Sequence, residues 1–133
     1  NISEALRYLV GVNKKRATTF LLSDFINSPG DMPKLEDALK IASSKHDIMA
    51  IEVMDRRDAE LPDIGIIEVR DAETGATEWL DTSSSRVRQF WQEQYTKRRE
   101  TVHNTLRHNR IDSTTVTTDG DYVAELIKMF KQR

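Results

Sequence analysis

Short apolar runs alternate with amphipathic segments along the first part of the chain. Residues 18–25 and residues 48–54 are nearly continuous in apolar side chains, which is typical of strands buried on both faces of a parallel sheet. A turn cluster at residues 27–31 and a segment with apolar side chains at helical spacing, residues 33–46, lie between them. This order predicts a right-handed βαβ unit in which residues 18–25 form a central strand.

The segments on either side of this unit are amphipathic or alternating. Residues 3–15 carry apolar side chains at helical spacing and predict a short N-terminal helix. Residues 64–69 and 77–80 are β-prone and flank a connection of hairpin length at residues 71–75, with a glycine near its end. We therefore expect a β-hairpin inserted after the parallel unit.

The longest amphipathic segment begins after possible caps at residues 82–85 and runs to about His108. Its apolar stripe is expected in the core and contains three aromatic residues, Phe90, Trp91 and Tyr95. On the remaining surface of this helix arginine and lysine outnumber glutamate, and we call residues 86–110 the basic helix. This surface either contacts phosphates or an acidic partner, or it solvates the outer face of the helix.

The chain closes with a β-prone run and one more helix. Residues 113–118 predict the strand, and Asp119 or Asp121 is expected to cap the helix. The apolar face of that helix comprises Val123, Leu126, Ile127 and Phe130. The alternation of helices and strands predicts an α/β fold, a three-layer sandwich with a mainly parallel, Rossmann-like central sheet of about four to six strands and a β-hairpin insertion.

The composition is that of one soluble domain over residues 1–133. Hydrophobic residues make up 38% and charged residues 32% of the chain, so a core can form and disorder is not expected. The absence of cysteine excludes disulfides and thiolate metal sites and favours the cytoplasm. No apolar run approaches the roughly 18 residues needed to span a bilayer. Because the first residue is Asn1 and a helical pattern follows at once, we expect either a processed product or a piece of a longer protein.

The net charge narrows the choice of partner. A formal charge of -2 gives no global attraction to nucleic acid, so a nucleic-acid partner is not expected. The alternative is that nucleic acid binds locally, through the basic helix at residues 86–110. Neither common phosphate-cradling loop, G-x-x-x-x-G-K-[ST] or G-x-G-x-x-G, occurs in the sequence. We therefore expect neither ATP hydrolysis nor any other enzymatic activity.

Acidic side chains follow the predicted parallel strands, at the edge of the sheet where ligands collect. Asp24 closes the first strand, Asp55 follows the second, and Asp119 follows the last. Such a carboxylate ligates Mg²⁺, acts as a base, or caps the following turn. A magnesium-dependent phosphoesterase that uses Asp24 and Asp55 is therefore an alternative function.

The three histidines carry no visible catalytic or zinc motif. His103 and His108 are five residues apart on the long helix, whereas a spacing of three or four would put them on one face. We expect these two residues and His46 to be ordinary, partly exposed histidines near helix ends.

Several motifs resemble one bacterial family, which is catalogued as domain of unknown function fifty-eight. The motifs are the run from Thr19 to Phe25, the run from Lys45 to Val53, Glu60 to Gly65, Asp71 to Gly75, Asp81 to Ser84, and Thr117 to Tyr122. Together they extend over essentially the whole chain, so the resemblance does not depend on one short match.

This resemblance implies a divergent von Willebrand factor A-like domain. Such domains hold a metal ion with an early D-x-S-x-S loop, a threonine and an aspartate that closes a central strand, and Asp24 matches that aspartate. No such loop precedes Asp24, so the chain resembles the C-terminal half of the domain, and Mg²⁺ would bind only if a missing N-terminal part completed the site. The implied role is a non-enzymatic protein-interaction module that works with a MoxR-type AAA+ ATPase in protein-complex assembly or in the maturation of a metal centre.

The apparent truncation leads to one further expectation. If the neighbouring strand on one side of residues 18–23 is missing, that apolar strand has an open edge, and open edges favour self-association. We therefore expect a homodimer or another strand contact at residues 18–23.

Overall fold

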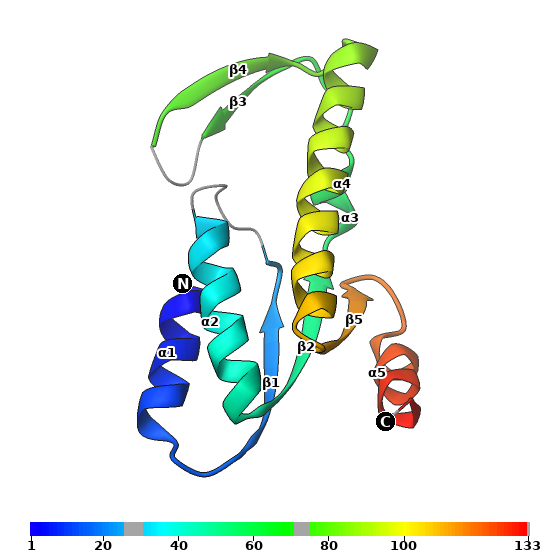
Figure 1. Ribbon diagram of the computed structural model, residues 1–133. Helices are drawn as coiled ribbons and strands as arrows, with labels where there is room; N and C mark the ends of the chain where they lie inside the picture. Colours follow the sequence, from blue (N-terminus) through cyan, green and yellow to red (C-terminus); the bar gives the residue numbers. More distant parts are fainter. Residues whose placement is uncertain (26–30, 71–74, 133) are drawn as a thin grey trace. The chain divides into compact units, whose positions relative to one another are not determined.

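The computed structural model describes residues 1–25, 31–70 and 75–132 (Figure 1). In chain order the elements are α1 (Ile2–Val12), β1 (Thr18–Ser23), α2 (Met32–Lys45), β2 (Asp47–Met54), α3 (Arg56–Ala59), β3 (Ile66–Arg70), β4 (Thr77–Asp81), α4 (Ser85–His108), β5 (Asp112–Thr117) and α5 (Tyr122–Lys131). Residues 27–30 of the expected turn and 71–74 of the expected hairpin connection lie outside the described residues.

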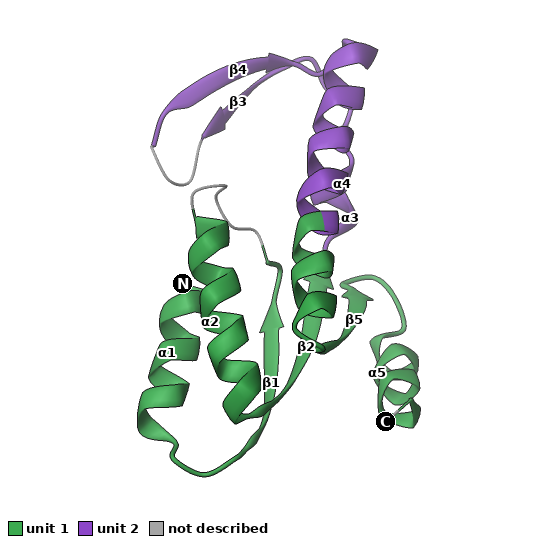
Figure 2. Cartoon of the chain, viewed as in Figure 1, with its two compact units in different colours: residues 1–54, 101–133 green, residues 55–100 purple. Residues whose placement is uncertain are grey.

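The chain divides into two compact units, which are described separately (Figure 2). Unit 1 comprises residues 1–54 and 101–133, and unit 2 comprises residues 55–100. The helix α4 is continuous in sequence and contributes its last turns to unit 1 and its first turns to unit 2.

Unit 1 contains the parallel sheet, in the order β1-β2-β5. β1 and β5 both pair with β2 in parallel, and Ser23 lies opposite Glu52 in the register. The expected βαβ unit, β1-α2-β2, is therefore confirmed, as is the mainly parallel sheet. The described sheet has three strands and not four to six, because β3 and β4 form a separate antiparallel pair.

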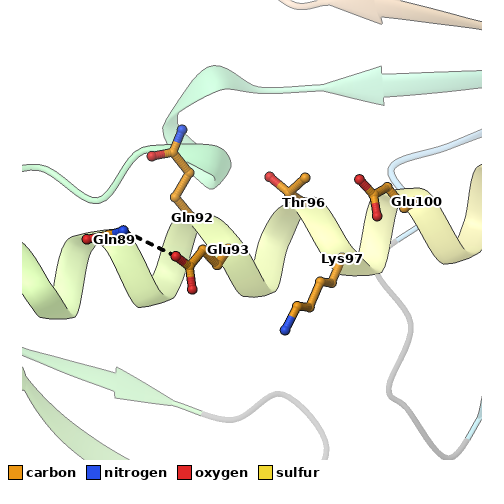
Figure 3. Close-up of a pocket in the computed structure, with 6 residues that line it drawn as sticks. All are labelled: Gln89, Gln92, Glu93, Thr96, Lys97 and Glu100. Carbon is orange, nitrogen blue, oxygen red and sulfur yellow. Dashed lines mark hydrogen bonds between the residues drawn. The ribbon is translucent and has the colours of Figure 1, made fainter.

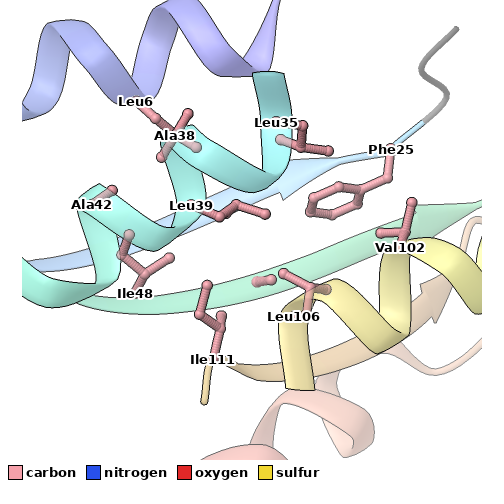
Figure 4. Close-up of a cluster of buried hydrophobic side chains, with 11 residues drawn as sticks. Leu6, Phe25, Leu35, Ala38, Leu39, Ala42, Ile48, Val102, Leu106 and Ile111 are labelled. Atoms are coloured by element: carbon pink, nitrogen blue, oxygen red, sulfur yellow. The ribbon is translucent and has the colours of Figure 1, made fainter. Parts of the chain in front are cut away.

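One face of this sheet carries the larger core (Figure 4). Ile48 and Ala50 of β2 point to this face, where they meet the apolar sides of α1 and α2 and the last turns of α4. Leu39 of α2 is 0% exposed and Leu106 of α4 is 1% exposed. The apolar side chains that recur at helical spacing along α2 therefore face this core.

The other face is covered by α5. Met49 and Ile51 alternate with the residues just named, as successive side chains of a strand must, and they cluster with Met129 and Leu126 of α5. Helices therefore lie on both faces of the sheet, and the expected α/β architecture is confirmed at that level.

The expectation that β1 is a central strand buried on both faces is wrong. Its burial alternates along Thr18–Ser23, and β1 pairs with β2 alone among the described strands. Phe20 and Leu22 are 46% and 63% exposed, on the face that α5 shares. The physical reason is that α5 packs mainly on β2 and β5 and meets β1 at Phe20, which contacts Phe130 and still stays exposed.

The closing helix shows the same incomplete coverage. Asp121, and not Asp119, provides the cap, because its Oδ1 accepts a hydrogen bond from the Ala124 N–H at 3.2 Å. Met129 is buried, whereas Ile127 and Phe130, expected on the buried face, are each 49% exposed. Only part of the apolar face of α5 is therefore buried against the sheet.

Unit 2 contains the expected hairpin, with β3 and β4 in antiparallel register. The buried Thr82, 0% exposed, follows β4 and ties the unit together. Its Oγ1 accepts a hydrogen bond from the Ile64 N–H at 3.0 Å and donates one to the Gly65 carbonyl. Gly65 has φ +86, a conformation that favours glycine.

The long helix α4 ends where the sequence predicts, at His108. The expectation that its three aromatic residues lie in the core is wrong for Phe90, which is 62% exposed, while Trp91 and Tyr95 are half-buried. The Trp91 Nε1–H donates a hydrogen bond to the Asp58 carbonyl at 3.2 Å within unit 2. Among the described residues, no helix is long and apolar enough to cross a membrane.

Candidate functional site

The carboxyl ends of the three parallel strands share one edge of the sheet, and Asp24 follows β1 there. Asp24 is exposed, while the next residue, Phe25, is 4% exposed and belongs to the larger core. Phe25 adopts a left-handed φ of 54°, and its N–H donates a hydrogen bond to Ser23 Oγ at 3.0 Å. This conformation is rare for a bulky residue, and it turns the aromatic ring inward and leaves Asp24 at the sheet edge.

The other strand-end carboxylates have local roles. Asp55 caps α3, because its Oδ1 accepts a hydrogen bond from the Arg57 N–H at 3.0 Å. Asp24 belongs to unit 1 and Asp55 to unit 2, so their joint use in a phosphoesterase stays a prediction. Among the described residues, no group of three or more His, Asp or Glu side chains could hold a metal ion, and the metal-binding role of Asp24 also stays a prediction.

The spacing D-x-S-x-S does occur later in the chain, at residues 81–85, a match that sequence reasoning missed. There the Asp81 Oδ1 accepts hydrogen bonds from the Ser83 N–H at 3.1 Å and from the Ser83 Oγ–H at 2.5 Å. These bonds, the side-chain bond first, lower the pKa of the fully exposed Asp81 below its ordinary value. Asp81 therefore closes the turn between β4 and α4.

A buried polar cluster lies within unit 1, on the face of the sheet that α4 covers. Glu52 of β2 is 4% exposed. Its Oε1 accepts a hydrogen bond from Thr115 Oγ1 of β5 at 2.9 Å and lies 3.2 Å from Nε2 of His103 on α4. Since Glu52 and Thr115 are directly opposite in the register, the pairing of β2 with β5 places both side chains on the same face.

This cluster fixes the orientation of one imidazole. Because an ionised carboxylate only accepts hydrogen bonds, Glu52 holds the proton of neutral His103 on Nε2. His103 also lines a hollow of about 350 Å³ along β5, together with Ser113 and Lys128. An oriented imidazole at a polar hollow can exchange protons or bind a polar group.

The sequence contained one signal for this cluster that was not used. Glu52 is the one charged residue in an otherwise apolar run, residues 48–54, and a charge there needs buried partners. His103 was expected to be an ordinary helix histidine, and its side chain is 33% exposed. No sequence pattern links it to Glu52, because the two residues are far apart in the chain.

The basic helix is partly occupied by contacts inside unit 2. Arg88 Nη1 donates a hydrogen bond to the Thr82 carbonyl at 2.6 Å and lies 3.6 Å from Asp63 Oδ2. A hollow of about 470 Å³ on α4 is lined by Gln89, Gln92, Glu93, Thr96, Lys97 and Glu100 (Figure 3). With two carboxylates and one ammonium, this hollow lacks the positive charge that a phosphate ligand requires.

Comparison with known proteins places the chain in a family. The family described as "Protein of unknown function DUF58" matches residues 1–101. The chain belongs to this family. The resemblance inferred from the motifs is thereby confirmed at the family level, whereas likeness to von Willebrand factor A domains stays a prediction. No solved structure matches the chain.

Relatives of this family member occur in mycobacteria. An uncharacterised protein of Mycobacterium avium is 30% identical over 133 residues, which are all of this chain and 76% of that protein. Uncharacterised proteins of Mycobacterium bovis and Mycobacterium tuberculosis are each 26% identical over 133 residues, 40% of their own length. The chain therefore spans less than half of these last two relatives.

Proposed function

We propose that the chain is a non-enzymatic protein-interaction module of the von Willebrand factor A type, which works with a MoxR-type AAA+ ATPase in protein-complex assembly. The position of Asp24 carries this proposal. Asp24 stands exposed at the carboxyl end of a parallel strand, where the buried, left-handed Phe25 keeps it at the sheet edge. In open α/β sheets this edge is the place where ligands bind.

An exposed apolar surface supports an interaction role. Phe20 of β1 and Phe130 of α5 meet edge to face, with ring centroids 5.9 Å apart, and both remain nearly half exposed. Leu22 and Ile127, on the same two elements, are 63% and 49% exposed. Contiguous exposed apolar side chains are typical of surfaces that bind proteins.

A divalent cation fits this proposal as a bridge between the module and its partner. Asp24 would supply one carboxylate ligand, and the remaining oxygens would come from other residues and from the partner, since Mg²⁺ commonly takes one or two protein carboxylates. The cation would orient the partner's carboxylate at the sheet edge. This role requires no bond to be made or broken.

The proposal is tested by a binding titration of the chain with a purified MoxR-type AAA+ ATPase from the same organism, with Mg²⁺ present. We expect saturable binding that Asp24→Ala weakens by about tenfold or more, as the loss of a charged contact worth about 1.5–3 kcal/mol requires. Asp37→Ala, an exposed acid on α2, is the matched control and should bind normally. No binding by the unaltered chain, or equal loss in both variants, would reject the proposal.

Calorimetric titration with Mg²⁺ and Mn²⁺ separates the metal from the partner. We expect heat of binding in the presence of the ATPase, and its loss with Asp24→Ala. If the partner binds equally in the presence of a chelator, the interaction module stands and the metal bridge does not.

A further inference from the structure

His46, the residue before β2, is buried with one ring nitrogen unpaired. His46 is 2% exposed, and its Nδ1 accepts a hydrogen bond from the Ala17 N–H at 3.0 Å. Because Nδ1 accepts, the neutral ring carries its proton on Nε2. This Nε2 is buried and has no hydrogen-bond partner within the described residues. A buried donor without an acceptor is rare in native proteins, so an acceptor brought to this nitrogen by a ligand would form a favourable hydrogen bond.

A positively charged hollow adjoins this histidine. The hollow measures about 320 Å³ and is lined by His46 and by three cationic residues from separate segments of unit 1, namely Arg16, Lys40 and Arg110. All three cationic residues are exposed, and none of them forms an ion pair with another described residue. Asp47 is the one carboxylate among the lining residues, so the hollow has an excess of positive charge.

The end of α4 brings one of these cations to the hollow. The Ile111 N–H donates a hydrogen bond to the Leu106 carbonyl at 2.9 Å, which closes the last turn of the helix. Arg110 occupies the left-handed position of this turn with φ 56, a position where glycine is usual. Arg110 therefore places a guanidinium group at the end of the helix, in a backbone conformation that glycine would adopt with less strain.

We propose that this hollow binds the phosphate group of a small molecule, either inorganic phosphate or a phosphate monoester. His46 Nε2–H donates to one phosphate oxygen, and the guanidinium groups of Arg16 and Arg110 and the ammonium of Lys40 compensate its charge. Guanidinium groups match the oxygens of a phosphate with paired hydrogen bonds. The volume is at the small end of the range of ligand sites, which suits a compact ligand.

Nε2 is buried in the absence of ligand, so binding of the anion requires the residues that cover this nitrogen to move. The site lies before the amino ends of β1, β2 and β5, whereas Asp24 lies beyond a carboxyl end. The phosphate site is therefore independent of the proposed metal contact at Asp24.

The test is an NMR titration of the 133-residue chain with inorganic phosphate and, separately, with glycerol phosphate, at constant ionic strength. We expect the Nε2–H resonance of His46 to shift and to exchange more slowly with solvent. Lys40→Gln and Arg16→Gln should each weaken binding by about tenfold, as the loss of one charged contact implies. Lys34→Gln, an exposed lysine on α2 outside the hollow, is the matched control and should leave affinity unchanged.

Three results would overturn the proposal. They are no saturable binding of either phosphate, equal effects of Lys34→Gln and Lys40→Gln, and equal competition by chloride at the same concentration. Because the His46 resonance is followed in the unaltered chain, the test does not depend on a His46 variant that might unfold. Tighter binding of glycerol phosphate than of inorganic phosphate would assign the site to an ester, and the reverse would assign it to the free ion.

Discussion

Nε2 of His103 lies 3.2 Å from Oε1 of Glu52 and joins the last turns of α4 to the middle of the parallel sheet. Glu52 is nearly fully buried in an apolar strand, where an unpaired carboxylate would be strongly unfavourable. Thr115 supplies its second hydrogen bond, from β5. Three elements of unit 1 are thus held together by one buried carboxylate.

Removal of the imidazole should therefore destabilise unit 1. We expect His103→Ala to lower the free energy of unfolding by about 1–3 kcal/mol, because the buried Glu52 carboxylate loses a hydrogen-bond partner. His108→Ala, an exposed position in the same helix turn region, is the control and should change stability little. Equal losses in the two variants, measured by urea unfolding, would show that the Glu52 contact is not responsible.

The elements formed by local patterns could be predicted from the sequence. Apolar runs and helical spacing correctly predicted the parallel unit and the end of α4, and the hairpin followed from turn residues. The position of β1 could not be predicted, because a run such as Phe20 to Leu22 fits a central strand and an edge strand equally well. Which face a helix covers depends on residues distant in sequence.

The polar sites were harder to predict for the same reason. Glu52 and His103, and likewise Ala17 and His46, are brought together only by the fold. Asp24 could be singled out because its significance is local, at the end of a strand. The D-x-S-x-S spacing at residues 81–85 is also local, and it was overlooked because residues 82–85 were interpreted as possible caps of the following helix.

The carboxyl group of Asp81 should titrate at lower pH than an ordinary aspartate. Its pKa lies below the usual 3.8 because Ser83 donates hydrogen bonds to it, first from the side chain and second from the backbone. The folded pKa is depressed, so this stabilisation is present above the ordinary pKa and is lost as the pH falls through the lowered value.

We expect Ser83→Ala to raise the pKa of Asp81 towards its ordinary value without reaching it, since the backbone hydrogen bond remains. An NMR pH titration of the carboxyl carbon measures this change. Ser84→Ala serves as the control, because Ser84 Oγ accepts from the Val87 N–H at 3.4 Å and not from Asp81. An unchanged pKa in Ser83→Ala would contradict the assigned cause.

The hydroxyl of Thr82 should be required for the stability of unit 2. Thr82→Val keeps the shape of the side chain but leaves the Ile64 N–H without its acceptor, and we expect a loss of about 1–3 kcal/mol in the free energy of unfolding. Thr82→Ser keeps the hydroxyl and should lose less. Hydrogen exchange of the Ile64 amide gives a local measurement, and protection that persists in Thr82→Val would contradict this role.

The open edge of β1 should associate with a second copy of the chain. Among the described strands β1 pairs with β2 alone, and its residues Thr18–Ser23 include no charge that would discourage pairing. An antiparallel pair of β1 strands would bring Arg16 of each copy towards Asp24 of the other and would join the exposed Phe20 side chains. We therefore expect a dimer in sedimentation equilibrium, and Leu22→Lys should shift it to monomer.

As a control, Ile41→Lys replaces another exposed apolar residue, which lies on α2 and is 50% exposed, and this variant should leave the dimer intact. Because the chain contains no cysteine, Phe20→Cys adds a single thiol. In the antiparallel register centred on Phe20 the two thiols face each other at the Cα separation of about 4.4–6.8 Å that a disulfide allows, so mild oxidation should link the copies, and Thr18→Cys should not. A monomer at all concentrations would contradict the predicted dimer, and linkage through Thr18→Cys alone would contradict the register centred on Phe20.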